Sequence, residues 1–369
     1  MEVKRYCKDS IELSEFRNLL ARGNHFFDLH TGVQSDDGYC LETYLKRNGD
    51  IVFPSVLCTE KGIFLRETGD KILSVNGIST EEILKEVREK LGVDMNPEYI
   101  YSMLSFSLEF QTILMCKNIT PPFSVEMEGQ YGKKSVLKVQ GANLRELQES
   151  LQKKLSVFFK NGPYDFEIHP EVSMAIIRFY VCDTVGLKSF FSNCFKEIKQ
   201  EKIKNIFVDV SLNGGGTTQA CELLFEQLNF DSKMEIVVSQ KEGGTLRSQR
   251  LRYNKRGRGE YSGNIYVFQS FLTVSSGTVI GEVLKSSRKA VLVGTRTGGC
   301  VPVYTDKENF ELSNSRIEVY CARQYYNQTR PQLQRDQDGF LLPDIFYPFG
   351  LDRQLELSDC IEIISLNKQ

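Results

Sequence analysis

A chain of 369 residues is long enough to hold two or three domains with separate cores. Hydrophobic residues make up 41% of the chain and charged residues 25%, a composition typical of a folded protein and not of a disordered one. Lysine and arginine number 46 against 48 acidic residues, so the net charge of -2 provides no field that would attract nucleic acid or an anionic membrane surface.

No stretch of the sequence reaches the roughly 18 apolar residues that cross a bilayer, and the start, MEVKRYCKDSIELSEF, has no apolar leader core. We therefore expect no transmembrane segment and a cytoplasmic location for the sequence as written. A cell-envelope or secreted location follows instead if a leader has been removed. The ten cysteines form no Cys-x-x-Cys pair and no cluster with histidine, which predicts reduced thiols and no bound metal.

Residues 1–37 are predicted to form an N-terminal helical segment. The stretch SIELSEFRNLLARG has apolar residues at helical spacing and ends in Gly23. It leads into HFFDLHTGV, which contains His25 and His30, two of the three histidines in the chain. Because histidines are so few, this segment is a candidate for a functional role.

Residues 38–93 are predicted to form a small β-rich module closed by a helix. Short strands lead to GDKILSVNG, an alternating strand that ends in an Asn-Gly turn, and Ser79 and Glu82 then form a capping-box pair for the helix. GDKILSVNG resembles the strand-and-turn signature of PDZ domains, which bind an extended peptide by adding it to a sheet edge. An ordinary Asn-Gly hairpin has the same pattern.

Residues 94–163 are predicted to be a connecting scaffold of helices and strands, and residues 164–369 an α/β domain. In the latter, the strands MAIIRFYVC, NIFVDV, NIYVFQ and AVLVG alternate with helical stretches such as LKSFFSNCFKEIK and TQACELLFEQL. Near-continuous apolar strands separated by helices are typical of a mostly parallel sheet covered on both faces. The basic stretch 247–258 is predicted to be a solvated hairpin loop.

Two unusual loops follow strands of this predicted sheet, where functional loops gather in open α/β folds. The first, DVSLNGGG, contains consecutive glycines whose N–H groups can approach a developing oxyanion, although a plain strand-to-helix turn has the same residues. The second, FLTVSSGTVIGEVL, has adjacent serines between a strand and a helix. That arrangement suits an exposed nucleophile and also suits helix capping.

In combination, these loops, the stretch VLVGTRTGG and the late phrase DGFLLPDI resemble the tail-specific, or C-terminal processing, serine peptidases in order and spacing. The resemblance covers residues 174–348, and extends more loosely to the histidine segment and the PDZ-like module. It implies an α/β fold with a crotonase- or Clp-protease-like ββα catalytic domain. It also implies a peptide or protein substrate, and neither a metal nor an organic cofactor.

The resemblance assigns roles to residues of both loops. In that family the nucleophile lies in a phrase like Thr-Ala-Ser-Ala-Ser-Glu, and TVSSGT aligns with Ser275 as the nucleophile and Ser276 as the donor of one oxyanion N–H. Gly214 or Gly215 supplies the second donor. Thr278 replaces the glutamate that often closes the phrase.

The general base differs between branches of the family. The lysine used by the bacterial processing peptidases is replaced here by Cys300. The tricorn-like branch takes a histidine from a context like Asp-x-His-Thr, which Asp28, His30 and Thr31 fit. We therefore expect His30 to be the base, because a neutral imidazole with a pKa of about 6.5 can accept the serine proton at pH 7.

A histidine base usually has a third group that fixes its tautomer. The tricorn-like branch uses a serine beside the histidine, and Leu29 stands there in this chain. Asp336 or Asp338 is the candidate orienting acid instead. His25 and His169 lie in no motif and are expected to be surface or packing residues.

The sequence therefore predicts a serine peptidase that acts through an acyl-enzyme on Ser275. The alternative is a catalytically inactive ligand- or peptide-binding protein on the same fold, like the retinoid-binding relatives of the family, which the departures at Cys300, Thr278 and Leu29 keep open. A crotonase-like acyl-CoA enzyme is a third interpretation, but it has no use for a strand-serine-helix turn. Nucleic acid is not an expected partner, and whether the chain forms a homo-oligomer is left open.

Overall fold

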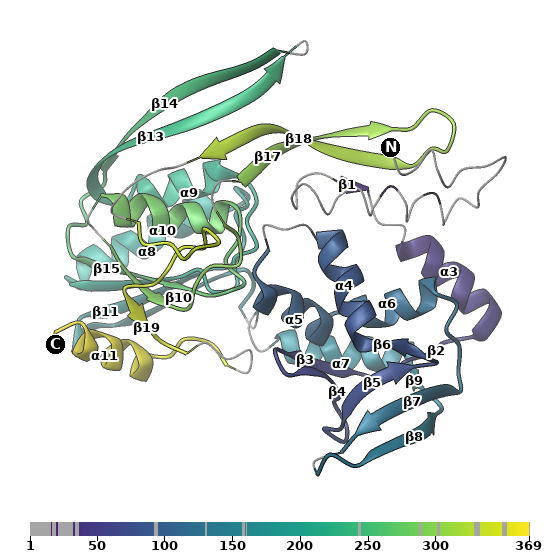
Figure 1. The fold of residues 1–369 in the computed structure, drawn as a ribbon. Helices are drawn as coiled ribbons and strands as arrows, with labels where there is room; N and C mark the ends of the chain where they lie inside the picture. The colour runs from purple at the N-terminus through teal and green to yellow at the C-terminus, as the bar shows by residue number, and fades with distance from the viewer. Residues whose placement is uncertain are drawn as a thin grey trace. The chain divides into compact units, whose positions relative to one another are not determined.

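The computed structural model describes residues 16, 20, 32–33, 37–91, 95–129, 131–156, 159, 161–242, 245–287, 290–300, 303–327, 333–348 and 353–368. The chain divides into two compact units (Figure 1). The first consists of residues 1–156 with 304–323, and the second of residues 157–303 with 324–369. Each unit has its own sheet and core, so the two are described separately.

The first unit is built on an antiparallel sheet in the order β3 (Val56–Thr59), β4 (Gly62–Leu65), β5 (Lys71–Val75), β7 (Phe123–Glu128) and β8 (Lys134–Val139), with β6 (Ile78–Ser79) beside β5. Alternate strand residues face a core shared with α4 (Thr80–Leu91), α5 (Pro97–Phe106) and α6 (Glu109–Cys116). Residues 38–93 and 94–163, which were predicted to be separate segments, thus contribute to one core.

A smaller core adjoins this one within the first unit. It joins α3 (Asp37–Asn48), β2 (Ile51–Val52), β9 (Ala142–Asn143) and α7 (Leu144–Ser156). Residues 37–48 were expected to begin the strands of the module, and they form a helix instead, because Tyr44 is buried against Leu147 and Leu151 in this core. A two-residue strand, β1 (Gly32–Val33), pairs with β18 (Glu318–Asn327), which also pairs with β17 (Val303–Glu311).

Helix α5 closes one edge of the first unit's sheet. Strand β3 has β4 as its only strand neighbour among the described residues, so its outer backbone groups need other partners. The Cys58 N–H donates to the buried Ser105 hydroxyl over 2.8 Å, and that hydroxyl lies 3.3 Å from the Cys58 carbonyl oxygen. Arg66 adds a hydrogen bond to the Ser105 carbonyl oxygen. The β3 edge is therefore occupied by the chain's own helix.

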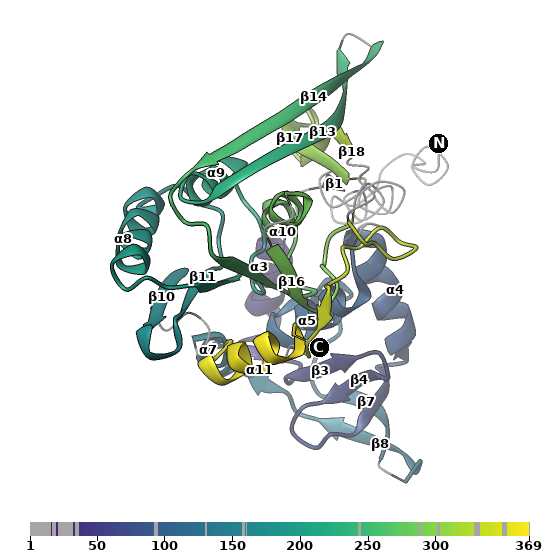
Figure 2. The ribbon, with the colours of Figure 1, turned by 90° about the vertical axis from the view of Figure 1, so that its left-hand side faces the viewer.

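The second unit contains a six-stranded sheet in the order β10 (Tyr164–His169), β11 (Met174–Phe179), β12 (Asn205–Asp209), β15 (Asn264–Gln269), β16 (Ala290–Gly294) and β19 (Ile345–Phe346). Only β10 is antiparallel to its neighbour. Helices α8 (Leu187–Gln200), α9 (Thr218–Phe225) and α10 (Ser276–Ser286) cover one face, and α11 (Leu357–Leu366) covers the other (Figures 1 and 2). The expected mixed α/β architecture is confirmed.

The second unit also contains a long hairpin, which lies between α9 and β15 in the sequence. Its strands, β13 (Asn229–Glu242) and β14 (Thr245–Arg258), pair over 14 residues each and extend well beyond the sheet (Figure 2). The stretch 247–258 was expected to be a solvated loop, and that expectation is wrong, since β13 pairs with it along its whole length.

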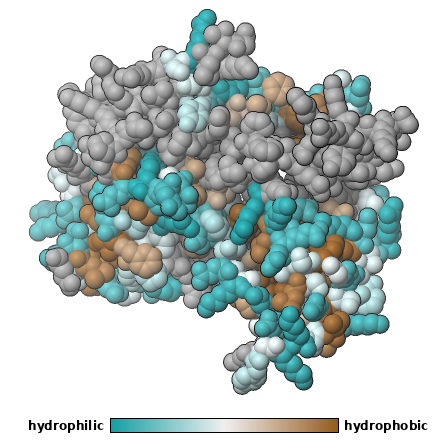
Figure 3. All heavy atoms as spheres, in the orientation of Figure 1, coloured by the Kyte–Doolittle hydropathy of each residue, from teal (hydrophilic) through white to brown (hydrophobic). Residues whose placement is uncertain are grey.

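The visible described surface in Figure 3 is mainly hydrophilic, with several separate hydrophobic areas. Large exposed apolar side chains include Val136 and Leu137 on β8 and Phe346 on β19. Within the described ranges, no helix combines the length and apolar character that a membrane crossing requires.

Candidate active site

Ser275 lies in the turn between β15 and α10, beyond the carboxyl end of a parallel strand. Its φ is 51° and its ψ is -127°, a backbone conformation that side-chain-bearing residues rarely adopt. Such a residue costs about 1–3 kcal/mol unless its surroundings hold it, and such residues cluster at functional sites. The half-buried side chain makes no capping hydrogen bond to α10, so helix capping does not explain the serine.

The turn before Ser275 is fixed by buried hydroxyl groups. The Thr273 hydroxyl accepts a hydrogen bond from the Ser270 N–H and donates to the Val210 carbonyl oxygen over 2.8 Å. The Ser270 hydroxyl donates to the Ser211 carbonyl oxygen. These bonds tie the end of β15 to the end of β12, and so hold the two unusual loops side by side.

The glycine loop reaches the side chain of Ser275. Gly215 has a φ of 98°, and a Cβ built there would lie 2.7 Å from Ser275 Cβ and 3.2 Å from Ser275 Oγ. The loop is held at its other side by the segment that follows β11, because the Cys182 N–H donates to the Gly215 carbonyl oxygen over 2.9 Å. Only glycine allows this approach and this backbone conformation at position 215.

Two backbone N–H groups near Ser275 have no hydrogen-bond acceptor within the described parts of the chain. Ser276 is the first residue of α10, where an N–H has no intrahelical partner. The Gly214 N–H is also without an acceptor there, and a Cβ at Gly214 would meet nothing within 4 Å. The Gly215 N–H, by contrast, donates to Asn213 Oδ1 over 2.9 Å. Of the two glycines predicted as alternative donors, Gly214 is the one whose N–H has no acceptor in the described parts of the chain.

The segment after β16 packs against the other side of the Ser275 turn. The Gly298 N–H donates to the Thr273 carbonyl oxygen over 2.9 Å, and a Cβ at Gly299 would lie 3.6 Å from the Ser275 nitrogen. Cys300, at the family's lysine position, follows directly, is half-buried and pairs with Phe340 in an isolated bridge. Position 300, where the family has its basic lysine, is therefore close to Ser275 in this chain. The residue at that position is a cysteine instead.

Asp336 and Asp338 form a turn ahead of the segment that pairs with Cys300. The Asp336 carboxylate accepts hydrogen bonds from the N–H groups of Asp338 and Phe340, each over 3.0 Å, and pairs with Arg296 over 3.1 Å. Asp338 is exposed. No hydrogen bond joins either carboxylate to Ser275 in the described structure, where the role found for Asp336 is to hold this turn.

The histidines are distributed unevenly. His30, the expected base, and its neighbours Asp28 and Leu29 lie outside the described residues, as does His25. His169 ends β10 opposite Met174, at the amino end of β11, and so at the opposite edge of the sheet from Ser275. It lies 3.6 Å from both Glu167 and Glu171.

A buried polar group precedes the glycine loop and was not singled out from the sequence. Asp209, the last residue of β12, is fully buried and accepts hydrogen bonds from the Tyr180 hydroxyl and the Ser211 N–H, both over 2.9 Å. Burial raises the pKa of Asp209, and burial and the neighbouring carboxylate raise that of Tyr180. An aspartate that ends an apolar strand before a glycine loop was the available signal.

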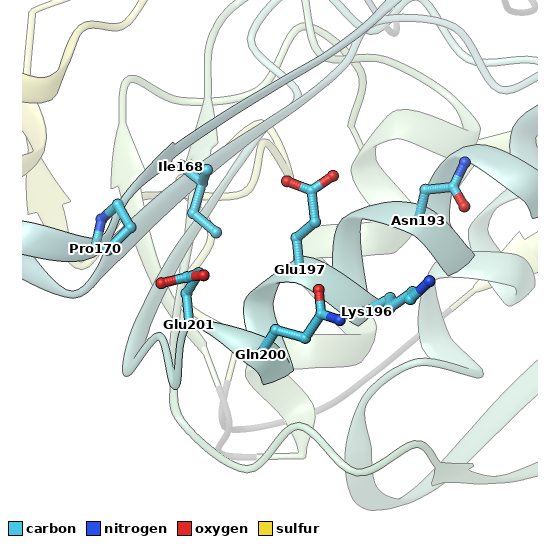
Figure 4. Close-up of a pocket in the computed structure, with 7 residues that line it drawn as sticks. All are labelled: Ile168, Pro170, Asn193, Lys196, Glu197, Gln200 and Glu201. Atoms are coloured by element: carbon cyan, nitrogen blue, oxygen red, sulfur yellow. The ribbon is translucent and has the colours of Figure 1, made fainter.

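Elsewhere in the described ranges, the features to consider are a possible metal site and a pocket that could bind a ligand. Histidine, cysteine and acidic side chains form no group of three there that could hold a metal ion. An open pocket of about 660 Å³ lies between α8 and the β10 end of the sheet (Figure 4). Its lining residues are acidic, basic, amide and apolar: Ile168, Pro170, Asn193, Lys196, Glu197, Gln200 and Glu201. None of them is among the residues that surround Ser275.

Comparison with known proteins finds a family model that matches the part of the chain around Ser275. Residues 174–345 match the model of peptidase family S41. Among solved structures, a CPAF mutant is 13% identical with a TM-score of 0.59, covering 94% of this chain and 85% of that chain. Mature CPAF is 14% identical with a TM-score of 0.55, covering 92% and 83%. The photosystem II D1 C-terminal processing protease is 14% identical with a TM-score of 0.45, covering 90% and 81%.

At these identities the structural likeness concerns the fold alone, and the family match rests on residues 174–345. No curated protein matches the chain. The matched range contains β11, β12, β15, α10 and β16, together with both unusual loops. The resemblance to the tail-specific, or C-terminal processing, serine peptidases is therefore confirmed, with residues 174–345 carrying the pattern of peptidase family S41.

Proposed function

We propose that this protein is a serine peptidase that cleaves peptide or protein substrates through an acyl-enzyme on Ser275. The observation that carries the proposal is the conformation of Ser275, which has a positive φ at the start of α10 and a hydroxyl free of any capping bond to the helix. Strained backbone of this kind presents a nucleophile at a strand-to-helix turn. The family match over residues 174–345 supports the same reaction class.

In this mechanism Ser275 Oγ attacks the carbonyl carbon of the scissile peptide bond, and its proton passes to the base. The carbonyl oxygen becomes an oxyanion that accepts hydrogen bonds from the Ser276 and Gly214 N–H groups, both of which lack other described acceptors. The base then gives the proton to the leaving amine as the peptide bond breaks. Water attacks the remaining ester by the reverse proton path, which releases the acid and restores Ser275.

His30 is the base in this proposal. The assignment rests on the Asp-x-His-Thr phrase and on the replacement of the family's lysine by Cys300. Asp336 or Asp338 remains the proposed orienting acid. The pairing of Asp336 with Arg296 and two backbone N–H groups favours Asp338, whose carboxylate is exposed.

We also propose the finer organisation implied by the resemblance. Residues 164–369 are a crotonase- or Clp-protease-like catalytic domain, 94–163 a scaffold, 38–93 a PDZ-like module and 1–37 the segment that carries His30. The succession of β4, β5, β6 and α4 supports a PDZ-like module. Because α5 occupies the β3 edge, an extended peptide that adds to this sheet needs another edge, and β8 has β7 as its only strand neighbour among the described residues.

Labelling with a fluorophosphonate tests the proposed function. The wild-type protein should be modified at one serine, Ser275→Ala should abolish the modification, and Ser276→Ala should spare most of it. Ser276→Ala is a matched control, because the Ser276 hydroxyl makes a structural bond to the Gly216 carbonyl oxygen over 2.8 Å and its N–H survives the substitution. A wild-type protein that is not labelled would favour the inactive binding protein or the acyl-CoA enzyme.

A further inference from the structure

Asn213 connects the glycine loop to two other segments of the second unit. Its side chain is fully buried. Asn213 Nδ2 donates to the Phe179 carbonyl oxygen at the end of β11 over 2.7 Å, and Oδ1 accepts from the Gly215 N–H over 2.9 Å. The Asn213 carbonyl oxygen accepts from the Val274 N–H over 3.0 Å. One residue thus bonds to β11, to the glycine loop and to the turn that carries Ser275.

The partners of the amide fix its orientation. Oδ1 faces two donors, the Gly215 N–H and the Cys182 thiol, whose sulfur lies 3.3 Å away, and Nδ2 faces a carbonyl oxygen. A flipped amide would place an N–H group against two donors and an oxygen against a carbonyl. Every polar atom of this buried side chain is therefore satisfied in one orientation only.

The first turn of α10 packs closely against Asn213. A Cβ at Gly277, in the first turn of α10, would lie 2.6 Å from the Asn213 carbonyl oxygen and 2.9 Å from Oδ1. The helix that begins next to Ser275 therefore rests directly on Asn213. Small movements of either would change the distance between the glycine loop and the serine.

We infer that Asn213 is a positioning residue that holds the glycine loop at a fixed distance from Ser275. Without Oδ1, the Gly215 N–H has lost its acceptor, and the loop that carries Gly214 is free to move relative to the serine. The catalytic consequence of this inference rests on the proposed function. Its structural consequence does not rest on that function, because the protection of the loop from hydrogen exchange can be measured without any assay of activity.

Hydrogen exchange followed by mass spectrometry tests the structural consequence. Asn213→Ala should accelerate exchange in peptides that cover residues 211–217, and leave peptides of β11 and β16 close to wild type. Asn205→Ala is the matched control, since Asn205 lies at the amino end of β12 and accepts a hydrogen bond from Asn264 over 2.9 Å. Unchanged exchange in 211–217, or equal acceleration by both variants, would overturn the inference.

Kinetics test the catalytic consequence. Asn213→Ala should lower kcat and the rate of fluorophosphonate labelling by roughly 10²-fold, the scale on which loss of an oxyanion donor acts, with little change in KM. Asn213→Asp has nearly the same volume and keeps an acceptor for Gly215, but it loses the donor to Phe179. If the bond to Oδ1 positions the loop, Asn213→Asp should be labelled faster than Asn213→Ala, because the Gly215 N–H keeps its acceptor, and equal labelling rates would count against the inference.

The two proposals fail in different ways. If the wild-type protein is not labelled at Ser275, the proposed function is wrong, and the exchange comparison alone decides the role of Asn213. If the wild type is labelled and Asn213→Ala is labelled equally fast, the positioning role is wrong and the proposed function stands. Should Asn213→Ala not fold, Asn213→Ser, which also lacks Oδ1, provides both measurements.

Discussion

Gly215 and Ser275 come from loops 60 positions apart in the sequence, and a Cβ on Gly215 would lie only 2.7 Å from Ser275 Cβ. Contacts of that length are not found between real carbon atoms, so the glycine loop approaches the serine as closely as a backbone without a side chain permits. The glycine loop and the Ser275 turn are thus in direct contact. This contact also makes position 215 a sensitive test of the site.

Gly215→Ala should lower the rate of serine labelling by about 10²-fold or more, because the new Cβ must displace either the loop or the serine. The φ of 98° at this position adds backbone strain. Gly214→Ala is the control, since a Cβ there meets nothing within 4 Å and the N–H is retained. The labelling rates of the two variants are compared. Equal rates would show that the close approach of Gly215 to Ser275 does not affect the reactivity of the serine.

His30→Ala should lower kcat by roughly 10²–10⁴-fold, as expected when a general base is removed. Activity of the wild type should fall as the pH drops through about 6.5, because a protonated imidazole cannot accept the serine proton. His169→Ala serves as the control, as His169 lies at the opposite edge of the sheet. A pH-rate profile recorded for all three proteins checks the assignment, and an equal loss in both variants would remove His30 from the mechanism.

Much of the second unit was predictable from the sequence because each strand is a short apolar run followed by a polar loop. NIFVDV and NIYVFQ correspond to β12 and β15, and the two loops after them carry the glycines and Ser275. It was not predictable that the Gly215 N–H donates to Asn213 Oδ1, while the Gly214 N–H has no acceptor among the described residues. That hydrogen bond depends on the direction of the Asn213 amide, which is set by Phe179 and Cys182, and no local pattern records those tertiary contacts.

The first unit shows the same limit. The sequence indicates a β-rich module closed by a helix, but it does not indicate that α5 packs on the β3 edge. That contact depends on Ser105, which lies 47 positions from Cys58 and has no motif around it. Strand β14 was also missed, because a basic stretch that contains a serine and a glycine has the composition of a solvated loop.

Ser105→Ala should destabilise the protein by about 1–3 kcal/mol, because the buried Cys58 N–H loses its acceptor. Ser102→Ala provides a control in the same helix, since the Ser102 hydroxyl only donates to the Glu98 carbonyl oxygen over 2.6 Å. Urea unfolding of both variants gives the difference in free energy. Equal and small losses would mean that the β3 edge does not depend on Ser105.

The C-terminal segment contains an ion pair whose contribution to stability should depend on pH. Arg353 Nη2 lies 2.7 Å from Asp359 Oδ1, and the Tyr347 hydroxyl donates to the same oxygen over 2.7 Å. Burial acts to raise the pKa of Asp359, but the hydrogen bonds from Arg353, the Glu356 N–H and Tyr347 outweigh it and hold the pKa below its ordinary value. The folded state therefore favours the ionised carboxylate.

Because the folded pKa of Asp359 is lowered, its stabilising effect is present above the ordinary aspartate pKa of about 3.9 and is lost as the pH falls through the folded value. Asp359→Asn should lower the unfolding temperature by roughly 3–6 °C at pH 7, and the gap to wild type should narrow below about pH 4. Glu362→Gln is the control, because it removes the other carboxylate that accepts from Tyr347 but keeps Asp359. Thermal unfolding across this pH range measures both differences, and a gap for Asp359→Asn that stays constant down to low pH would show that ionisation of Asp359 is not what stabilises this segment.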